Sequence, residues 1–163
     1  MNAASSISSQ DGNIRVDAQD SLSLSAVNAN SNADATTGNV ALRARTGSIT
    51  DTNGATLNIT AQDLLMQAGT SIAANADRLE TSAANLAAVA DAGGLFVSNT
   101  GALAVTQLTE IAMADGRVIT GLSSTAGGDL ITTATGAMTV NQAVNAAGGG
   151  QVLLASNGNA ATN

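Results

Sequence analysis

The strongest constraint on the fold is a repeated motif. In each copy a glycine opens a stretch of alternating apolar and polar residues, and a turn residue eight or nine positions later opens a second one. Six imperfect copies begin at Gly12, Gly38, Gly54, Gly93, Gly128 and Gly150. The longer gaps predict two further units, around Ile72–Val89 and Ile111–Leu122. Self-similarity of this kind is typical of chains that stack repeated units on one another.

Each stretch alternates with the period of two that is expected of a β-strand. The residues expected to point inward are Ile14, Val16, Val40, Leu42, Ala44, Leu57, Ile59, Leu103, Val105, Met138 and Val140. Glycine suits the turns because it adopts backbone angles that are closed to other residues. Asp20 and Asp63 occupy equivalent turn positions, which indicates a structural role.

One such strand pair buries little apolar surface, so each unit must stack on the next. We therefore expect an all-β parallel β-helix, a solenoid of about eight rungs, roughly 40 Å long at the usual strand spacing. The repeat domain is expected over residues 12–158. Residues 1–11 are expected to be a flexible or capping segment, and residues 159–163 a flexible tail.

Residues 71–90 leave an alternative open. Apolar residues fall there at helical spacing, at Ile72, Ala76, Leu79, Ala83, Leu86 and Ala90. Thr70 or Ser71 could cap such a helix and Gly93 could end it. The flanking segments are strand-like, and Ala-rich stretches fit a narrow interior. We therefore favour irregular β-rungs over a helix.

Composition agrees with a narrow core and limits the partners. The only aromatic residue is Phe96, expected to be a core or groove-capping residue, and Trp, Tyr, His, Cys, Pro and Lys are absent. The net charge is −7 with five Arg, so no basic stripe exists to bind nucleic acid. No apolar run approaches the ~20 residues that membrane insertion requires. Met1–Gln10 lacks the regions of a signal peptide, so a role outside the cell implies an excised or processed chain.

Candidates for catalysis are few. Without His or Cys, the His-based triads, cysteine nucleophiles and most zinc sites are excluded. Paired carboxylates, as used on polysaccharides, would remain. The acids are Asp11, Asp17, Asp20, Asp34, Asp51, Asp63, Asp77, Glu80, Asp91, Glu110, Asp115 and Asp129. They are spread thinly, with no aromatic residues to stack on a sugar. We expect no enzyme and no catalytic, cofactor-binding or metal-binding residues.

Weaker binding signals have simpler structural interpretations. Gly127-Gly128-Asp129 resembles a calcium-binding repeat but occurs once, and Asp17, Asp20 and Asp34 are expected to form a solvated acidic face. Thr132–Thr135 does not recur as an ice-binding array would require. Asn58-Ile59-Thr60 matches a glycosylation sequon but is expected to be a strand end. Arg43 and Arg45 could bind an anion, although exposed salt bridges are the simpler interpretation.

Three strings carry a family resemblance: GNVALRARTGSITDTNGATLNITAQDLLMQAGTSI, LFVSNTGALAV and GGDLITTATGAMTVNQAVNAAGGGQVLLASNG. In repeat style, over about Gly12 to Gly158, the chain resembles the repeat region of filamentous haemagglutinin-like adhesins, exported by two-partner secretion in Gram-negative bacteria. The resemblance implies a right-handed β-helix forming the shaft of a fibrous protein. That family's secretion domain carries Asn-Pro motifs, and this chain has no Pro. The resemblance therefore covers shaft material alone.

The expected function is a structural shaft segment of a secreted or cell-surface bacterial adhesin, with no chemistry of its own. The alternative is a self-assembling subunit that stacks end to end into an extracellular filament or surface layer. A β-helix ends in open strand edges, and the Lys and Pro that often guard such edges are absent. Self-association, or contact with neighbouring repeats, is thus the expected partnership. A host receptor or glycan is not indicated.

Overall fold

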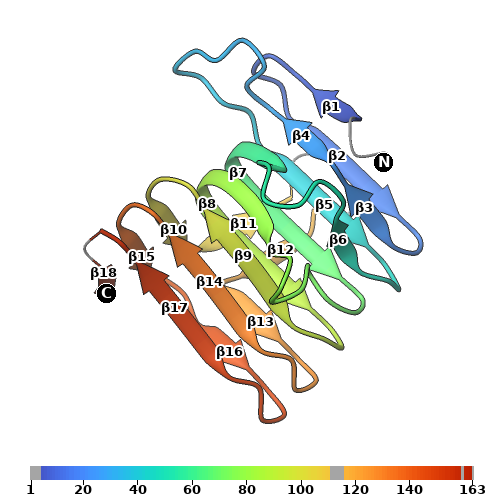
Figure 1. Cartoon of the computed structure of the whole chain (residues 1–163), viewed down its shortest axis with the longest axis vertical. Coiled ribbons are helices and arrows are strands. Elements are labelled where there is room, and N and C mark those ends of the chain that lie inside the picture. Colours follow the sequence, from blue (N-terminus) through green and yellow to red (C-terminus); the bar gives the residue numbers. More distant parts are fainter. Residues whose placement is uncertain (1–4, 111–115, 159, 163) are drawn as a thin grey trace.

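A computed structural model of the chain describes residues 5–110, 116–158 and 160–162 (Figure 1). These residues form strands and turns without any helix, so the all-β prediction is confirmed. Most strands are parallel, and 14 of those in the described residues belong to one sheet. In Figure 1 the strands follow one another from the blue amino-terminal end to the red carboxy-terminal end.

The strand bounds are short and regularly spaced. The first nine strands are β1 (Ser6–Ser8), β2 (Ile14–Ala18), β3 (Leu22–Leu24), β4 (Ala26–Asn28), β5 (Val40–Ala44), β6 (Ile49–Asp51), β7 (Ile59–Ala68), β8 (Leu79–Ala90) and β9 (Leu95–Asn99). The others are β10 (Leu103–Val105), β11 (Gln107–Thr109), β12 (Val118–Thr120), β13 (Leu122–Ser124), β14 (Leu130–Ala134), β15 (Met138–Val140), β16 (Val144–Ala146), β17 (Val152–Ser156) and β18 (Ala160–Thr162).

Strand pairing places distant residues in columns, each named here by its first member. The Ile14 column contains Ile14, Val40, Leu64, Leu86, Val105, Val140 and Thr162. The Val16 column contains Val16, Leu42, Met66, Ala88, Leu122 and Val144. The Leu22 column contains Leu22, Ile49, Ile72, Leu95, Leu130 and Val152. The Ile7 column contains Ile7, Val27, Ile59, Thr81, Asn99, Ala134 and Ser156.

The chain visits these columns in the same order on every pass. It runs through the Ile14, Val16, Leu22 and Ile7 columns and then begins the next pass. Successive members of the Leu22 column are 22–27 residues apart, except for the 35 residues between Leu95 and Leu130. Within the described residues this gives six passes, fewer than the eight rungs expected. The motif copies at Gly38 and Gly54 lie closer together than one pass, so counting copies overestimated the number.

The core follows from the columns. Apolar residues in the middle of each column belong to one buried cluster, which includes Leu42, Met66, Ile72 and Leu130. At the last pass, in contrast, Val152 is 47 % exposed because no further strand covers it. Leu103, Val105 and Met138 are buried as the alternation predicts. Leu57 is not: its side chain is 43 % exposed, because it lies in the loop before β7.

Residues 71–90 adopt the favoured interpretation. Ile72 bridges to Ile49 and Leu95, and residues 79–90 form strand β8, which pairs with β7 along most of its length. The alternative of a helix is wrong. Ala83 and Ala90, two of the residues that gave the helical spacing, are buried on β8 in a narrow interior between strands.

The unit expected around Ile111–Leu122 is wrong. β11 and β12 pair antiparallel and form a hairpin outside the parallel stack, and residues 111–115 lie outside the described part. Gly121 donates a 2.9 Å backbone hydrogen bond to Thr106, so the chain leaves the stack and returns at nearly the same place. A two-residue alternation is the same in a hairpin and in a stacked strand, and the sequence pattern could not separate them.

Two expectations about turns also need correction. Asp63 lies within strand β7, not in a turn, and its carboxylate accepts a 2.7 Å hydrogen bond from Asn85 on β8. Most motif glycines do not have left-handed backbone angles; Gly54 and Gly101 do. At Gly38, Gly136 and Gly150 a Cβ would meet neighbouring backbone instead. A Cβ on Gly128 would lie 2.1 Å from the carbonyl carbon of Gly93, so close stacking of turns demands glycine there.

The terminal segments contribute strands to the stack. β1 pairs with β4, and β18 pairs with β15, each over three residues. The domain boundaries at residues 12 and 158 stay a prediction.

Candidate functional site

The hairpin formed by β11 and β12 is the largest departure from the repeated pattern, and it packs against the outer surface of the sheet. Leu108 on β11 and Ile119 on β12 contact Leu65 on β7 and Ala87 on β8. Leu65 and Ala87 pair in register and point away from the main core. The hairpin therefore buries an apolar strip that would otherwise face solvent.

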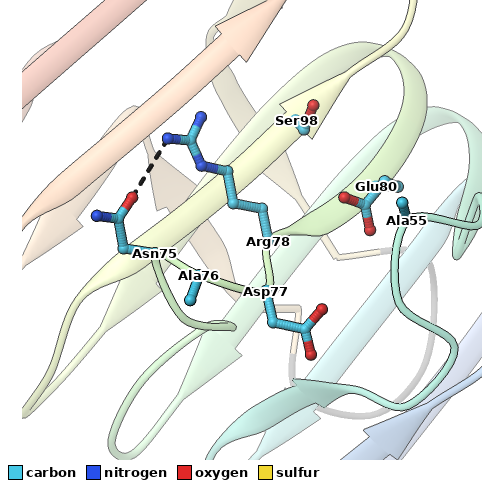
Figure 2. A pocket seen from close by; sticks show the side chains of 7 residues that line it. All are labelled: Ala55, Asn75, Ala76, Asp77, Arg78, Glu80 and Ser98. Carbon is cyan, nitrogen blue, oxygen red and sulfur yellow. Dashed lines mark hydrogen bonds between the residues drawn. The ribbon is translucent and has the colours of Figure 1, made fainter.

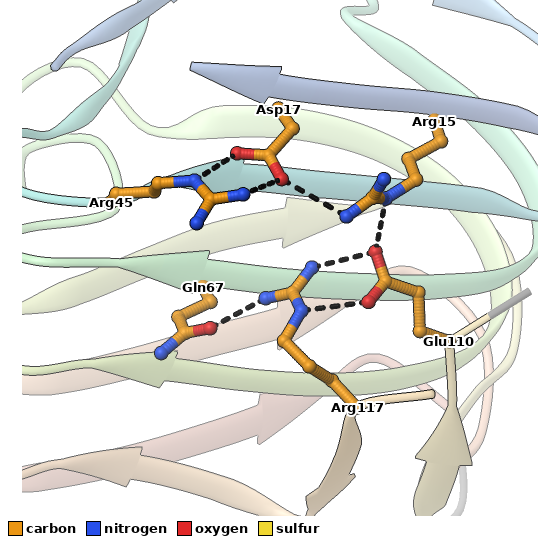
Figure 3. Close-up of polar contacts among 6 residues, drawn as sticks. All are labelled: Arg15, Asp17, Arg45, Gln67, Glu110 and Arg117. Carbon is orange, nitrogen blue, oxygen red and sulfur yellow. Dashed lines mark hydrogen bonds and ion pairs between the residues drawn. The ribbon is translucent and has the colours of Figure 1, made fainter. Parts of the chain in front are cut away.

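A polar network fastens the hairpin to the sheet (Figure 3). The carboxylate of Glu110 accepts two hydrogen bonds from Arg117, at 2.7 and 2.8 Å, and one from Arg15 at 2.6 Å. Arg117 also donates to the side-chain oxygen of Gln67 at 2.5 Å. Arg15 lies on β2 in the first pass and Gln67 on β7 in the third, so the hairpin spans three passes of the chain.

Asp17 extends the network to β5. It accepts two 2.8 Å hydrogen bonds from Arg45 and one of 3.0 Å from Arg15. Arg45 thus forms a salt bridge, as the simpler interpretation of this residue predicted. Four of the five arginines lie on or beside β2, β5 and the hairpin: Arg15, Arg43, Arg45 and Arg117. Their acidic neighbours there are Asp17 and Glu110.

The charges in this network are held in their ionised forms. Hydrogen bonds from Arg117, and then from Arg15, lower the pKa of Glu110 to about 2 although its side chain is fully buried. The hydrogen bond from Arg45 lowers the pKa of Asp17 in the same way. Carboxylates this acidic do not exchange protons near neutral pH, so the network is suited to holding structure and not to acid–base catalysis.

A second group of carboxylates lies at a shallow surface pocket of about 250 Å³ (Figure 2). Its lining comprises Ala55, Asn75, Ala76, Asp77, Arg78, Glu80 and Ser98. Arg78 donates a 3.2 Å hydrogen bond to Asn75, while the carboxylates of Asp77 and Glu80 stand apart from that pair. Asp77 also lines a neighbouring depression of about 310 Å³ together with Asp51.

In this pocket the pKa of a carboxyl group is raised, whereas in the hairpin network the carboxyl pKa values are lowered. Partial burial raises the pKa of Glu80, and the negative charges of Asp51 and Asp77 raise it further. One oxygen of Asp51 and one of Glu80 are buried without a hydrogen-bond partner. Among the described residues, however, no group of three or more His, Cys, Asp or Glu has the arrangement of a metal site. The lining of the pocket contains no aromatic side chain on which a sugar could stack.

The remaining acids are dispersed, as the sequence predicts. Asp20 accepts a 3.0 Å hydrogen bond from Thr46, and Asp129 accepts one of 2.9 Å from the backbone of Gln151. Asp11 and Asp34 both accept from Asn32, at 3.4 and 2.8 Å. Asp17 is separated from this group by its ion pairs with arginine. Asp115 lies outside the described residues.

Two further sequence signals have structural explanations. Asn58, in the glycosylation sequon, is 1 % exposed, and its amide donates to Ser25, Asp51 and Asn53. It is therefore a buried corner residue, close to the strand-end interpretation. Thr132 is fully buried, so the Thr-rich segment does not form a flat exposed array.

Phe96 is half-buried against the main core, as expected of a core or capping residue.

Sequence reasoning missed both clusters. Arg15 and Glu110 are 95 residues apart, and no pattern in the sequence reveals the path of the hairpin. Glu80 lies one pass beyond Asn58 and donates its backbone N–H to the Asn58 side chain, which in turn donates to Asp51. A correct pass length would therefore have placed Glu80 beside Asn58 and brought the two acids together.

Comparison of the chain with protein-family models, with curated proteins and with solved structures finds no match. In the part of the chain that the structure describes, no helix is long and apolar enough to cross a membrane.

Proposed function

We propose that the chain is a parallel β-helix segment that serves as the shaft of a fibrous, secreted or cell-surface bacterial adhesin like filamentous haemagglutinin. One observation carries this proposal: the chain visits four residue columns in the same order on six passes. A coil with right-handed crossovers is the usual way to connect parallel strands in this order. Such a coil lengthens by ~4.8 Å per pass and needs no other machinery.

The polar groups support a structural role without chemistry of its own. Asp17 and Glu110 are neutralised by arginines, and Asp20, Asp63 and Asp129 hold neighbouring residues of the stack. The chain has neither His nor Cys, so it has no His-based triad and no cysteine nucleophile. The proposed location, outside a Gram-negative cell, is supported by the repeat resemblance to exported adhesins.

Surface labelling tests this proposal. An antibody raised against the purified chain should label intact cells of the source bacterium, and protease added to intact cells should remove the label. A cytoplasmic protein probed in parallel controls for leakage. Labelling that requires permeabilised cells would contradict a surface shaft.

A second candidate, a subunit that stacks end to end into a filament or surface layer, is favoured by the two open ends. β2 and β3 each pair on one side, with β5 and β6, while β16 and β17 each pair on one side, with β13 and β14. Val152 and Leu153 at the carboxy-terminal end are 47 and 48 % exposed. Open strand edges beside apolar side chains recruit further strands.

Sedimentation separates the two candidates. A filament subunit should show a sedimentation coefficient that rises with concentration, and electron micrographs should show rods of varying length. A strict monomer over a wide concentration range would contradict self-assembly and leave the shaft as the remaining candidate.

A further inference from the structure

The columns do not all have the same number of members. In the described residues the Val16 and Leu22 columns contain six residues each, whereas the Ile7 and Ile14 columns contain seven. The additional members come from the two terminal strands: Ile7 lies on β1, and Thr162 lies on β18. Without these two strands, every column would have six.

This excess matters when a second copy continues the stack. A second copy whose β2 and β3 pair with β16 and β17 brings its Val16 beside Val144 and its Leu22 beside Val152. Its Ile7 then falls at the position already held by Ser156, the last member of the Ile7 column. Its Ile14 falls at the position held by Thr162. Two segments cannot fill the same space, so β1 of the second copy must give way to β17 of the first, and β18 of the first copy must give way to β2 of the second.

We propose that the chain joins end to end with a second copy through β16–β2 and β17–β3 pairing, and that β1 and β18 are removable caps on the joining ends. This inference rests on the second candidate function and specifies its partner and register. The joint is head to tail, because strands in the stack are parallel, and such a joint repeats without closing.

The contacts of the caps suit a removable role. β1 pairs with β4 over three residues, and all three residues of β1 are exposed, Ile7 by 36 %. The proposed joint covers apolar surface. Val152 and Leu153 of β17 are exposed in the single chain, and β3 of the second copy would cover them. Exchange therefore gives up the short, exposed pairing of β1 and buries apolar side chains at the joint.

Disulfide tethers test the caps in the full chain, because the chain has no cysteine of its own. Ser6→Cys with Ala26→Cys ties β1 to β4, and Thr139→Cys with Ala161→Cys ties β18 to β15. Register partners on neighbouring strands lie within the 4.4–6.8 Å Cα separation that a disulfide accepts. The matched control ties β9 to β14 in the body through Ser98→Cys with Thr133→Cys.

Sedimentation velocity of each variant is compared before and after reduction. We expect the variant with both caps tied to stay monomeric when oxidised and to associate at least tenfold more readily when reduced. The body control should associate equally in both states. Equal association of the doubly tethered variant in both states would overturn the caps but leave end-to-end assembly intact. Monomers under all conditions would overturn both.

Crosslinking between chains tests the register of the joint. Leu153 follows Val152 and Ser23 follows Leu22, so these two residues should meet across the joint. Mixed Ser23→Cys and Leu153→Cys chains should form a crosslinked pair on oxidation. Ala155→Cys is the control, because it lies two residues along β17 at a diagonal distance of about 7–8 Å. Crosslinking that favours Ala155→Cys over Leu153→Cys would overturn the register.

Discussion

The carboxylate of Glu110 accepts a 2.6 Å hydrogen bond from the guanidinium of Arg15, 95 residues earlier in the chain. This contact joins the hairpin, which leaves the stack in the fifth of the six passes, to the first full pass of strands. The hairpin therefore acts as a strap over the outer surface, with Leu108 packed beneath it against Leu65 and Ala87.

Glu110→Gln should destabilise the fold by about 2–3 kcal/mol, because it leaves Arg15 and Arg117 without the carboxylate that neutralises them. Urea unfolding followed by circular dichroism measures the change. Asp91→Asn, at an exposed position, is the control and should change stability by less than about 0.5 kcal/mol. Equal stability of the two variants would show that the strap contributes nothing.

The same network predicts a dependence on pH. The pKa of Glu110 is about 2 in the folded chain, against 4.5 as its ordinary value. Its contribution to stability is therefore complete above pH 4.5 and is lost as the pH falls from 4.5 toward 2. Asp17, whose pKa is also lowered, acts in the same direction. The difference in melting temperature between the wild type and Glu110→Gln should shrink over this range, and a constant difference would contradict the prediction.

Glu80→Gln should change the stability of the fold in the opposite direction to Glu110→Gln. Burial and the charges of Asp51 and Asp77 raise the pKa of Glu80, so its contribution is most favourable below pH 4.5 and is lost as the pH rises through the folded-state pKa. The Gln variant should gain roughly 0.5 kcal/mol at pH 7, the scale of a partly exposed site, and nothing near pH 4. Thermal melts at both pH values measure this, and a loss of stability at pH 7 would count against it.

Gly128→Ala should destabilise the chain by more than about 3 kcal/mol, because the new Cβ would meet the backbone of Gly93 and Gly94 at 2.1–2.3 Å. Gly12→Ala is the matched control. Its Cβ would approach the hydroxyl of Ser9 at 2.7 Å, and that side chain can rotate away. Comparable losses for the two glycines would refute close stacking as the reason for glycine at position 128.

The sequence predicted the parts of the fold that depend on local alternation. Leu103 and Val105 alternate with polar residues, and both are buried as predicted. Residues 71–90 required context, because Ala83 and Ala90 satisfy helical and strand spacing alike. The hairpin could not be foreseen, since Gln107–Thr109 alternates as a stacked strand does. Its partners Arg15 and Gln67 are fixed by tertiary packing, which leaves no periodic trace in a single sequence.

The central structural claim is that 22 residues make one pass that can be removed without changing the register of the stack, as between Leu130 and Val152. Deleting residues 130–151 places Val152 directly after Leu95 in the Leu22 column, whereas deleting residues 130–140 places Asn141 there and breaks the register. Far-UV circular dichroism with thermal unfolding compares the two variants. The 22-residue deletion should keep a β-sheet spectrum and a cooperative transition, and the 11-residue deletion should lose both. Loss of cooperative folding in the 22-residue deletion, or equal behaviour of the two, would contradict the account.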